Sequence, residues 1–261
     1  MTILKPSSDW FNLAIPICST TKSALDYHQI PIDLDSKGNQ EPLVKVCDYG
    51  IKSRSAYAHK MAPYHHSFTK ALPVPLLRET VATKLAQVNS QIKSYGVELL
   101  VLDGFRPIEL QQELWDHFIE IARQIMPDAK DQELVAYVGQ YWSDPRHFKE
   151  DDYRTWPTHN TGGAVDLTLQ DVDTGQDLFM GSVFDDVDPV SSTRYFEDLT
   201  MTSLSALEAR KNRRLLYHAM TSSGFLNYHH EWWHFDYGTQ MAIMNGSQEK
   251  IASYGRATIV K

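Results

Sequence analysis

The sequence predicts a mixed α+β fold, a single domain in which helices pack on one face of an antiparallel sheet. Apolar residues recur at helical spacing in several long segments, and short apolar or aromatic runs between them have the character of strands. No internal repeat or flexible linker divides the 261 residues. We therefore expect one domain over residues 1–261, with a divergent N-terminal part (1–70) and a core over residues 76–237.

Helices are predicted from the middle of the chain onward. After Pro75, apolar residues fall at helical spacing as far as Ile92, and Gly96 marks the end of this helix. Pro107 opens the next helix at its first position, and Pro127 ends it. Two more helices are predicted over residues 131–142 and 205–222.

Strands are predicted where apolar runs are short and end in turn signals. Residues 97–102 are such a run, followed by Asp103-Gly104, and residues 164–169 alternate well enough for a strand. Two aromatic-rich segments, 225–228 and 232–237, are predicted to be strands as well. Residues 170–200 are rich in turn formers and predict a long loop that could include a hairpin. Residues 1–70 are punctuated by prolines and predict loops and short strands packed on a larger core.

Composition narrows the function and the setting of the chain. A net charge of −8 argues against nucleic acid or an anionic membrane as the partner. Cys18 and Cys47 lack CxxC spacing, so we expect buried structural thiols in a reduced setting. No apolar signal segment or membrane span is evident, which predicts a cytoplasmic protein, or a periplasmic one if a signal has been removed.

Two short motifs carry the chemistry. His159-Asn-Thr-Gly-Gly-Ala-Val-Asp166 and Glu231-Trp-Trp-His234 together offer two histidines and two carboxylates. Three of them, His159, Asp166 and His234, suit a catalytic zinc site that leaves a fourth position for water. Glu231 is then placed to take the proton of that water, whose pKa the metal lowers to roughly 7. The sequence therefore predicts a metal-dependent hydrolase.

Other histidines are weaker candidates. His230 and His234 also match H-E-x-x-H, which would bind zinc only on a helix, and the aromatic run around them disfavours a helix. His59, His65 and His66 have no carboxylate or cysteine at ligand spacing and are predicted to be surface or structural histidines.

At these motifs the chain resembles the D-alanyl-D-alanine dipeptidases, the VanX-type zinc D,D-peptidases. That family carries H-x-x-G-x-A-x-D and E-W-W-H, which match His159–Asp166 and Glu231–His234. Further matches occur in the same order over roughly residues 76–237: Asp103-Gly-Phe-Arg-Pro107, Asp166-Leu-Thr-Leu169, Asp173-Thr-Gly175, Met180-Gly-Ser182, Phe184-Asp185, Asn212-Arg-Arg and Ser223-Gly-Phe225. One difference precedes the first histidine, where Pro157-Thr158 replaces small hydroxyl residues and Pro157 has no N–H to donate.

The resemblance implies a role for six residues. His159, Asp166 and His234 would hold one zinc ion, and Glu231 would act first as general base and then as general acid. Arg106 would stabilise the oxyanion of the tetrahedral intermediate, for which a permanently charged guanidinium is suited. Asp185 would pair with the free ammonium group of the substrate and so restrict the enzyme to dipeptides.

We therefore expect zinc-dependent hydrolysis of D-alanyl-D-alanine, or a similar small dipeptide, by zinc-bound water. A D,D- or L,D-carboxypeptidase acting on longer cell-wall peptides is the alternative enzyme, and a non-catalytic zinc-binding module is the alternative outside catalysis. The ligand set also suits manganese, cobalt or nickel. A monomer and a symmetric dimer are both compatible with the sequence.

Overall fold

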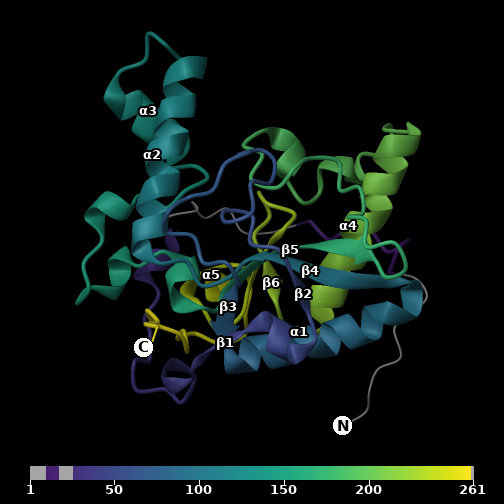
Figure 1. Ribbon diagram of the computed structural model, residues 1–261, viewed down its shortest axis with the longest axis horizontal. Coiled ribbons are helices and arrows are strands. Elements are labelled where there is room, and N and C mark those ends of the chain that lie inside the picture. The colour runs from purple at the N-terminus through teal and green to yellow at the C-terminus, as the bar shows by residue number, and fades with distance from the viewer. Residues whose placement is uncertain (1–9, 18–25, 260–261) are drawn as a thin grey trace.

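A five-stranded sheet forms the centre of the computed structural model, which describes residues 10–17 and 26–259 (Figure 1). The strand order is β2-β4-β5-β7-β6, with these bounds: β2 (Lys52–Ser53), β4 (Val97–Asp103), β5 (Ala164–Asp171), β6 (Leu226–Asn227) and β7 (His234–Asp236). Neighbouring strands are antiparallel except at one edge, where β2 runs parallel to β4. The predicted α+β fold is confirmed, and the parallel edge strand is an addition to it.

The described residues form five α-helices: α1 (Glu79–Ile92), α2 (Ile108–Ile125), α3 (Asp131–Val138), α4 (Leu204–Ser222) and α5 (Gln240–Met244). Helices α1 and α4 contact each other and the sheet, whereas α2 and α3 pack together at one end of the molecule (Figure 1). A separate two-stranded sheet joins β1 (Leu43–Lys45) to β3 (Leu76–Arg78). None of the helices in the described ranges is long and apolar enough to cross a membrane.

Alternation along β5 separates the apolar core from the polar face of the sheet. Val165, Leu167 and Leu169 are fully buried in the main hydrophobic cluster, which also contains residues of α1 and α4. Because successive side chains of a strand point to opposite faces, Asp166 and Thr168 lie on the other face. The helices therefore cover the apolar side, and the polar side is left for chemistry.

A register shift near the end of β4 brings a second carboxylate to that polar face. Val101 pairs with Leu167, but two residues later Asp103 pairs with Asp166, so one residue of β4 is skipped. Without the shift, Asp103 would lie on the same face as Val101, toward the core. With it, Asp103 and Asp166 are neighbours on the polar face.

Several element boundaries differ from those that the sequence predicts. Pro107 precedes α2 as its N-cap, and α3 ends at Val138 before Gly139. The two aromatic strands are shorter than predicted, because Phe225 and Tyr228 lie outside β6 and Trp232 and Trp233 form a turn before β7.

Cys47 and three histidines lie at the surface of the protein. The expectation of a buried thiol is wrong for Cys47, which is exposed, and Cys18 lies outside the described residues. The surface positions predicted for three histidines are confirmed: His59, His65 and His66.

Candidate metal centre

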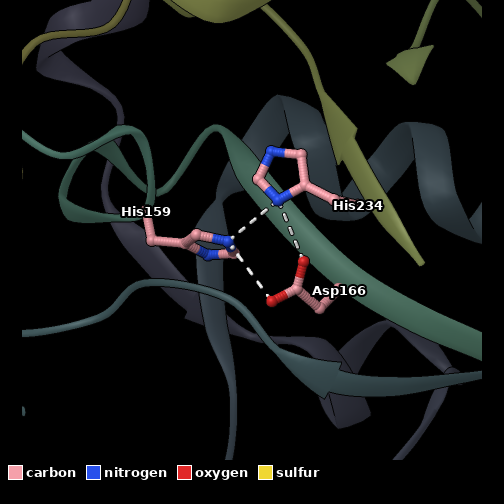
Figure 2. A group of neighbouring side chains, drawn as sticks. All are labelled: His159, Asp166 and His234. Carbon is pink, nitrogen blue, oxygen red and sulfur yellow. Dashed lines mark hydrogen bonds and ion pairs between the residues drawn. The ribbon is translucent and has the colours of Figure 1, made fainter. Parts of the chain in front are cut away.

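His159, Asp166 and His234 come together on the polar face of the sheet (Figure 2). One ligand atom from each lies within 4.8 Å of the others. His159 Nε2 is 3.3 Å from Asp166 Oδ2, and His234 Nδ1 is 3.1 Å from Asp166 Oδ1. The two ring nitrogens are 3.2 Å apart. Three buried donor atoms therefore converge on one point, as a metal ion requires.

Strand pairing and one tight turn position these side chains. Asp166 on β5 pairs directly with His234 on β7, whereas His159 lies in a 3-10 turn just before β5. Gly162 ends that turn with a φ of 73°, which is unfavourable for a residue with a Cβ atom. A Cβ atom on Gly163 would lie 2.7 Å from both the Tyr237 carbonyl oxygen and Thr239 Cγ2. The glycine pair is therefore required for this close approach.

The second nitrogen of each imidazole is held by a hydrogen bond away from the cluster. His159 Nδ1–H donates to the Gly104 carbonyl oxygen at 2.9 Å, and His234 Nε2–H donates to Asp236 Oδ2 at 2.8 Å. These acceptors select the tautomers in which His159 Nε2 and His234 Nδ1 present lone pairs toward Asp166. Both rings are therefore preset to bind a metal.

Asp236 is itself fixed by two threonines. Its Oδ1 accepts hydrogen bonds from the hydroxyls of Thr158 and Thr239, both at 2.7 Å, and the carboxylate is fully buried. Thr158 precedes His159 in the chain, so Asp236 links the turn that carries His159 to the strand that carries His234. The orientation of the two rings is therefore coupled through one carboxylate.

Glu231 lies in the turn before β7, with Oε2 3.8 Å from His234 Nδ1. Its side chain is only 14% exposed, and burial raises the pKa of its carboxyl to about 7. His234 opposes this rise in pKa, whereas the charge of Asp166 adds to it. A carboxylate with a pKa near neutrality is suited to both taking and giving a proton.

The H-E-x-x-H alternative is wrong for this chain. His230 is exposed in a turn, so it does not share a helical face with His234. The cluster takes His159 and Asp166 as its other members instead.

Arg106 is buried beside the cluster. Its guanidinium forms an ion pair with Asp103 at 2.8 Å and a longer one with Asp166 at 3.4 Å. It also donates to Gln111 Oε1 at 3.0 Å and to the Tyr57 hydroxyl at 2.9 Å. The guanidinium is therefore held from several sides, which fixes where its positive charge acts.

Asp185 occupies the same region on a loop between β5 and α4. Its φ of 58° is uncommon for a residue other than glycine. Its Oδ2 accepts hydrogen bonds from the hydroxyls of Tyr57 at 2.9 Å and Tyr64 at 2.6 Å. Burial raises the pKa of this carboxyl well above its usual range, and the charge of Asp166 raises it further, although Arg106 opposes this.

All six residues that the sequence singled out line one cavity of about 60 Å³: Arg106, His159, Asp166, Asp185, Glu231 and His234. Three supporting residues were missed from the sequence, namely Tyr57, Tyr64 and Asp236, and Asp103 was placed only in a turn and in a family motif. Asp236 had a usable signal, because a residue two positions after His234 on a strand shares its face. Tyr57 and Tyr64 had no such signal, since residues 1–70 show no clear hydrophobic periodicity.

Comparisons with known proteins identify the family of this chain. A family model described as D-Ala-D-Ala dipeptidase matches residues 44–253. A D-alanyl-D-alanine dipeptidase of Synechocystis is 32% identical, over 83% of this chain and 92% of that protein. One from Enterococcus faecium is 42% identical, over 59% of this chain and 69% of that protein.

A more distant likeness is to a crystal structure of the vancomycin resistance D,D-pentapeptidase VanY in complex with Zn(II). It has a TM-score of 0.34 and 15% identity, covering 81% of this chain and 88% of that one, and carries no part of the assignment. The family model and the curated relatives carry it, and the chain belongs to the D-Ala-D-Ala dipeptidase family of metallopeptidases.

Proposed function

We propose that this protein hydrolyses D-Ala-D-Ala, or a similar small dipeptide, with one zinc ion held by His159, Asp166 and His234. The observation that carries the proposal is the convergence of these three donor atoms in a cavity that also holds Glu231. Two histidines and a carboxylate leave a coordination position open, as catalytic rather than structural zinc sites do. The names of the relatives supply the substrate.

The charges around the cluster also fit a dication. Asp103, Asp166, Asp185 and Glu231 lie close together, and Arg106 is the arginine that faces them. Burial raises the pKa of the Asp103, Asp185 and Glu231 carboxyls, and the charge of Asp166 adds to each rise. A bound dication would offset this electrostatic repulsion among the buried carboxylates.

Glu231 performs the proton transfers. When bound, zinc supplies Lewis-acid chemistry that acidifies water and polarises a carbonyl group. Glu231 takes a proton from the attacking water and later gives it to the departing amine, for which its position beside His234 is suited.

Arg106 and Asp185 act on the substrate. Arg106 stabilises the negative charge that develops on the carbonyl oxygen, because its guanidinium is preorganised by Asp103 and Gln111. Asp185 binds the free ammonium group, and the hydroxyls of Tyr57 and Tyr64 hold its carboxylate in place.

Chelation tests the proposal directly. Purified protein is expected to release D-alanine from D-Ala-D-Ala, to lose that activity when a chelator removes the metal, and to regain it when zinc is added back. D-alanine release is measured with a coupled D-amino-acid oxidase assay. A zinc-loaded protein that prefers an N-acylated peptide over the free dipeptide would contradict the role of Asp185 and favour a carboxypeptidase.

Asp236 is expected to strengthen zinc binding although it is not itself one of the three converging residues, because its carboxylate accepts a hydrogen bond from His234. Asp236→Ala removes the acceptor that orients the ring, so we expect zinc affinity to fall by about 10- to 100-fold. Competition with a chromophoric chelator measures this affinity. Thr158→Val and Thr158→Ser form a matched pair, because only Ser keeps the hydroxyl that holds Asp236. Equal zinc affinity in that pair would argue against this support.

A further inference from the structure

Tyr228 is buried with an unused hydrogen-bonding group. The residue is only 4% exposed, and its hydroxyl has no hydrogen-bond partner among the residues that the structure describes. Most buried hydroxyls in proteins are paired, because leaving one unpaired is costly. The same residue lines the cavity that holds His234 and Glu231. An unpaired buried donor at a binding cavity points to a ligand oxygen as its partner.

Two of the neighbouring hydroxyls that line the cavity are already engaged, and a third, that of Tyr141, belongs to a side chain that is only half-buried. The Ser143 hydroxyl shares a hydrogen bond with Tyr27, and the Thr158 hydroxyl donates to Asp236. Pro157 also lines the cavity but has no N–H to donate. Tyr228 is therefore the buried hydroxyl that this side still has to offer.

Tyr228 and Asp185 are held in place by different residues. Tyr228 packs in a cluster with Tyr27, Met241 and Met244, whereas Asp185 is held by Tyr57 and Tyr64. The two sets share no residue, so a dipeptide whose ammonium group binds Asp185 leaves its other end for Tyr228.

Glu231 gives a second reason for the same placement. Its backbone N–H donates to the Tyr228 carbonyl oxygen at 3.0 Å, and both residues line the same cavity. Glu231 protonates the departing amine, and that amine belongs to the residue that carries the terminal carboxylate. A donor beside Glu231 therefore lies on the leaving-group side.

We propose that the Tyr228 hydroxyl donates a hydrogen bond to the C-terminal carboxylate of the bound dipeptide. The proposal rests on the dipeptidase function above, and it supplies the donor that Pro157 lacks. A tyrosine hydroxyl keeps its proton at neutral pH, so it can donate this hydrogen bond.

The test compares two substrates in two proteins. D-Ala-D-Ala and its C-terminal amide differ only in the group that Tyr228 would bind, and both release D-alanine. We expect Tyr228→Phe to lower kcat/KM for the free acid by about 10- to 100-fold, mainly through KM, with a much smaller effect on the amide. The preference of the wild-type enzyme for the acid should therefore shrink in the variant.

Controls separate this role from a structural one. Tyr228→Phe should leave zinc content unchanged and should not lower Tm, because the hydroxyl it removes has no protein partner. Tyr137→Phe on α3 removes a hydroxyl outside the cavity and should leave kcat/KM unchanged for both substrates. An active wild type with an equal loss on both substrates, or no loss on either, overturns the assignment of Tyr228 alone. A zinc-loaded wild type that cleaves neither substrate overturns the proposed function as well.

Discussion

Glu231→Gln is expected to lower kcat by about 10²- to 10⁴-fold while leaving bound zinc in place. Gln keeps the size and shape of the side chain but cannot take a proton from water or return it to the departing amine. Zinc is retained because Glu231 is not one of the three converging residues. Rates of D-alanine release and zinc content by elemental analysis give the two readouts.

The same exchange at an exposed glutamate controls for the loss of one negative charge. Glu208 is exposed on α4, so Glu208→Gln should keep full activity. Turnover by Glu231→Gln within tenfold of the wild type would show that another group moves the proton. Loss of zinc along with activity would instead make Glu231 part of the metal site and remove its role as the base.

The local motifs of this chain predicted its candidate metal centre because the relevant geometry is also local. His159 and Asp166 are joined by one turn and the start of one strand, and Glu231 and His234 by another turn and strand. In both cases residue type, glycine placement and strand periodicity restrict where the side chains can point. Only the pairing of β5 with β7 had to be supplied by the tertiary structure.

The support of the site depends on contacts that leave no local pattern. Asp103 faces Asp166 because the register shifts by one residue in β4, and an apolar run does not reveal such a shift. Tyr57 lies 128 residues from Asp185, which its hydroxyl contacts. Such a contact is set by how the whole chain packs.

The aromatic segment before the C-terminal region shows a different reason for error. β-propensity predicted two strands of four and six residues, but β6 has two residues and β7 has three. Tyr228, Trp232 and Trp233 are buried outside these strands, so their aromatic character serves packing and the cavity. Propensity reports that a side chain suits a half-buried surface, and turns can supply such a surface too.

Arg106→Ala is expected to damage both stability and catalysis. The guanidinium pairs with Asp103 and Asp166 while almost fully buried, and its removal leaves the buried Asp103 carboxylate without its arginine partner. Breaking a buried pair by removing one member costs about 3–5 kcal/mol in free energy of unfolding. Loss of an oxyanion donor lowers kcat by about 10²- to 10³-fold. Denaturant unfolding and D-alanine release measure the two effects separately.

An exposed arginine pair provides the contrast. Arg154 pairs with Asp152 at 2.8 Å, nearly the same distance as Arg106 with Asp103, but its side chain is 59% exposed. Solvent screens such pairs, so Arg154→Ala should cost far less stability than Arg106→Ala and leave kcat unchanged. Equal losses of stability in the two variants would mean that the buried ion pair of Arg106 with Asp103 matters no more than the exposed pair of Arg154 with Asp152.

Arg106→Lys separates charge from geometry. Lys keeps the positive charge but cannot reach Asp103, Gln111 and Tyr57 at once, as the planar guanidinium does. We expect it to recover most of the lost stability and little of the lost kcat, because the oxyanion requires a donor held in one place. Recovery of both in parallel would show that Arg106 acts only as a counter-charge, and the oxyanion would then depend on the metal alone.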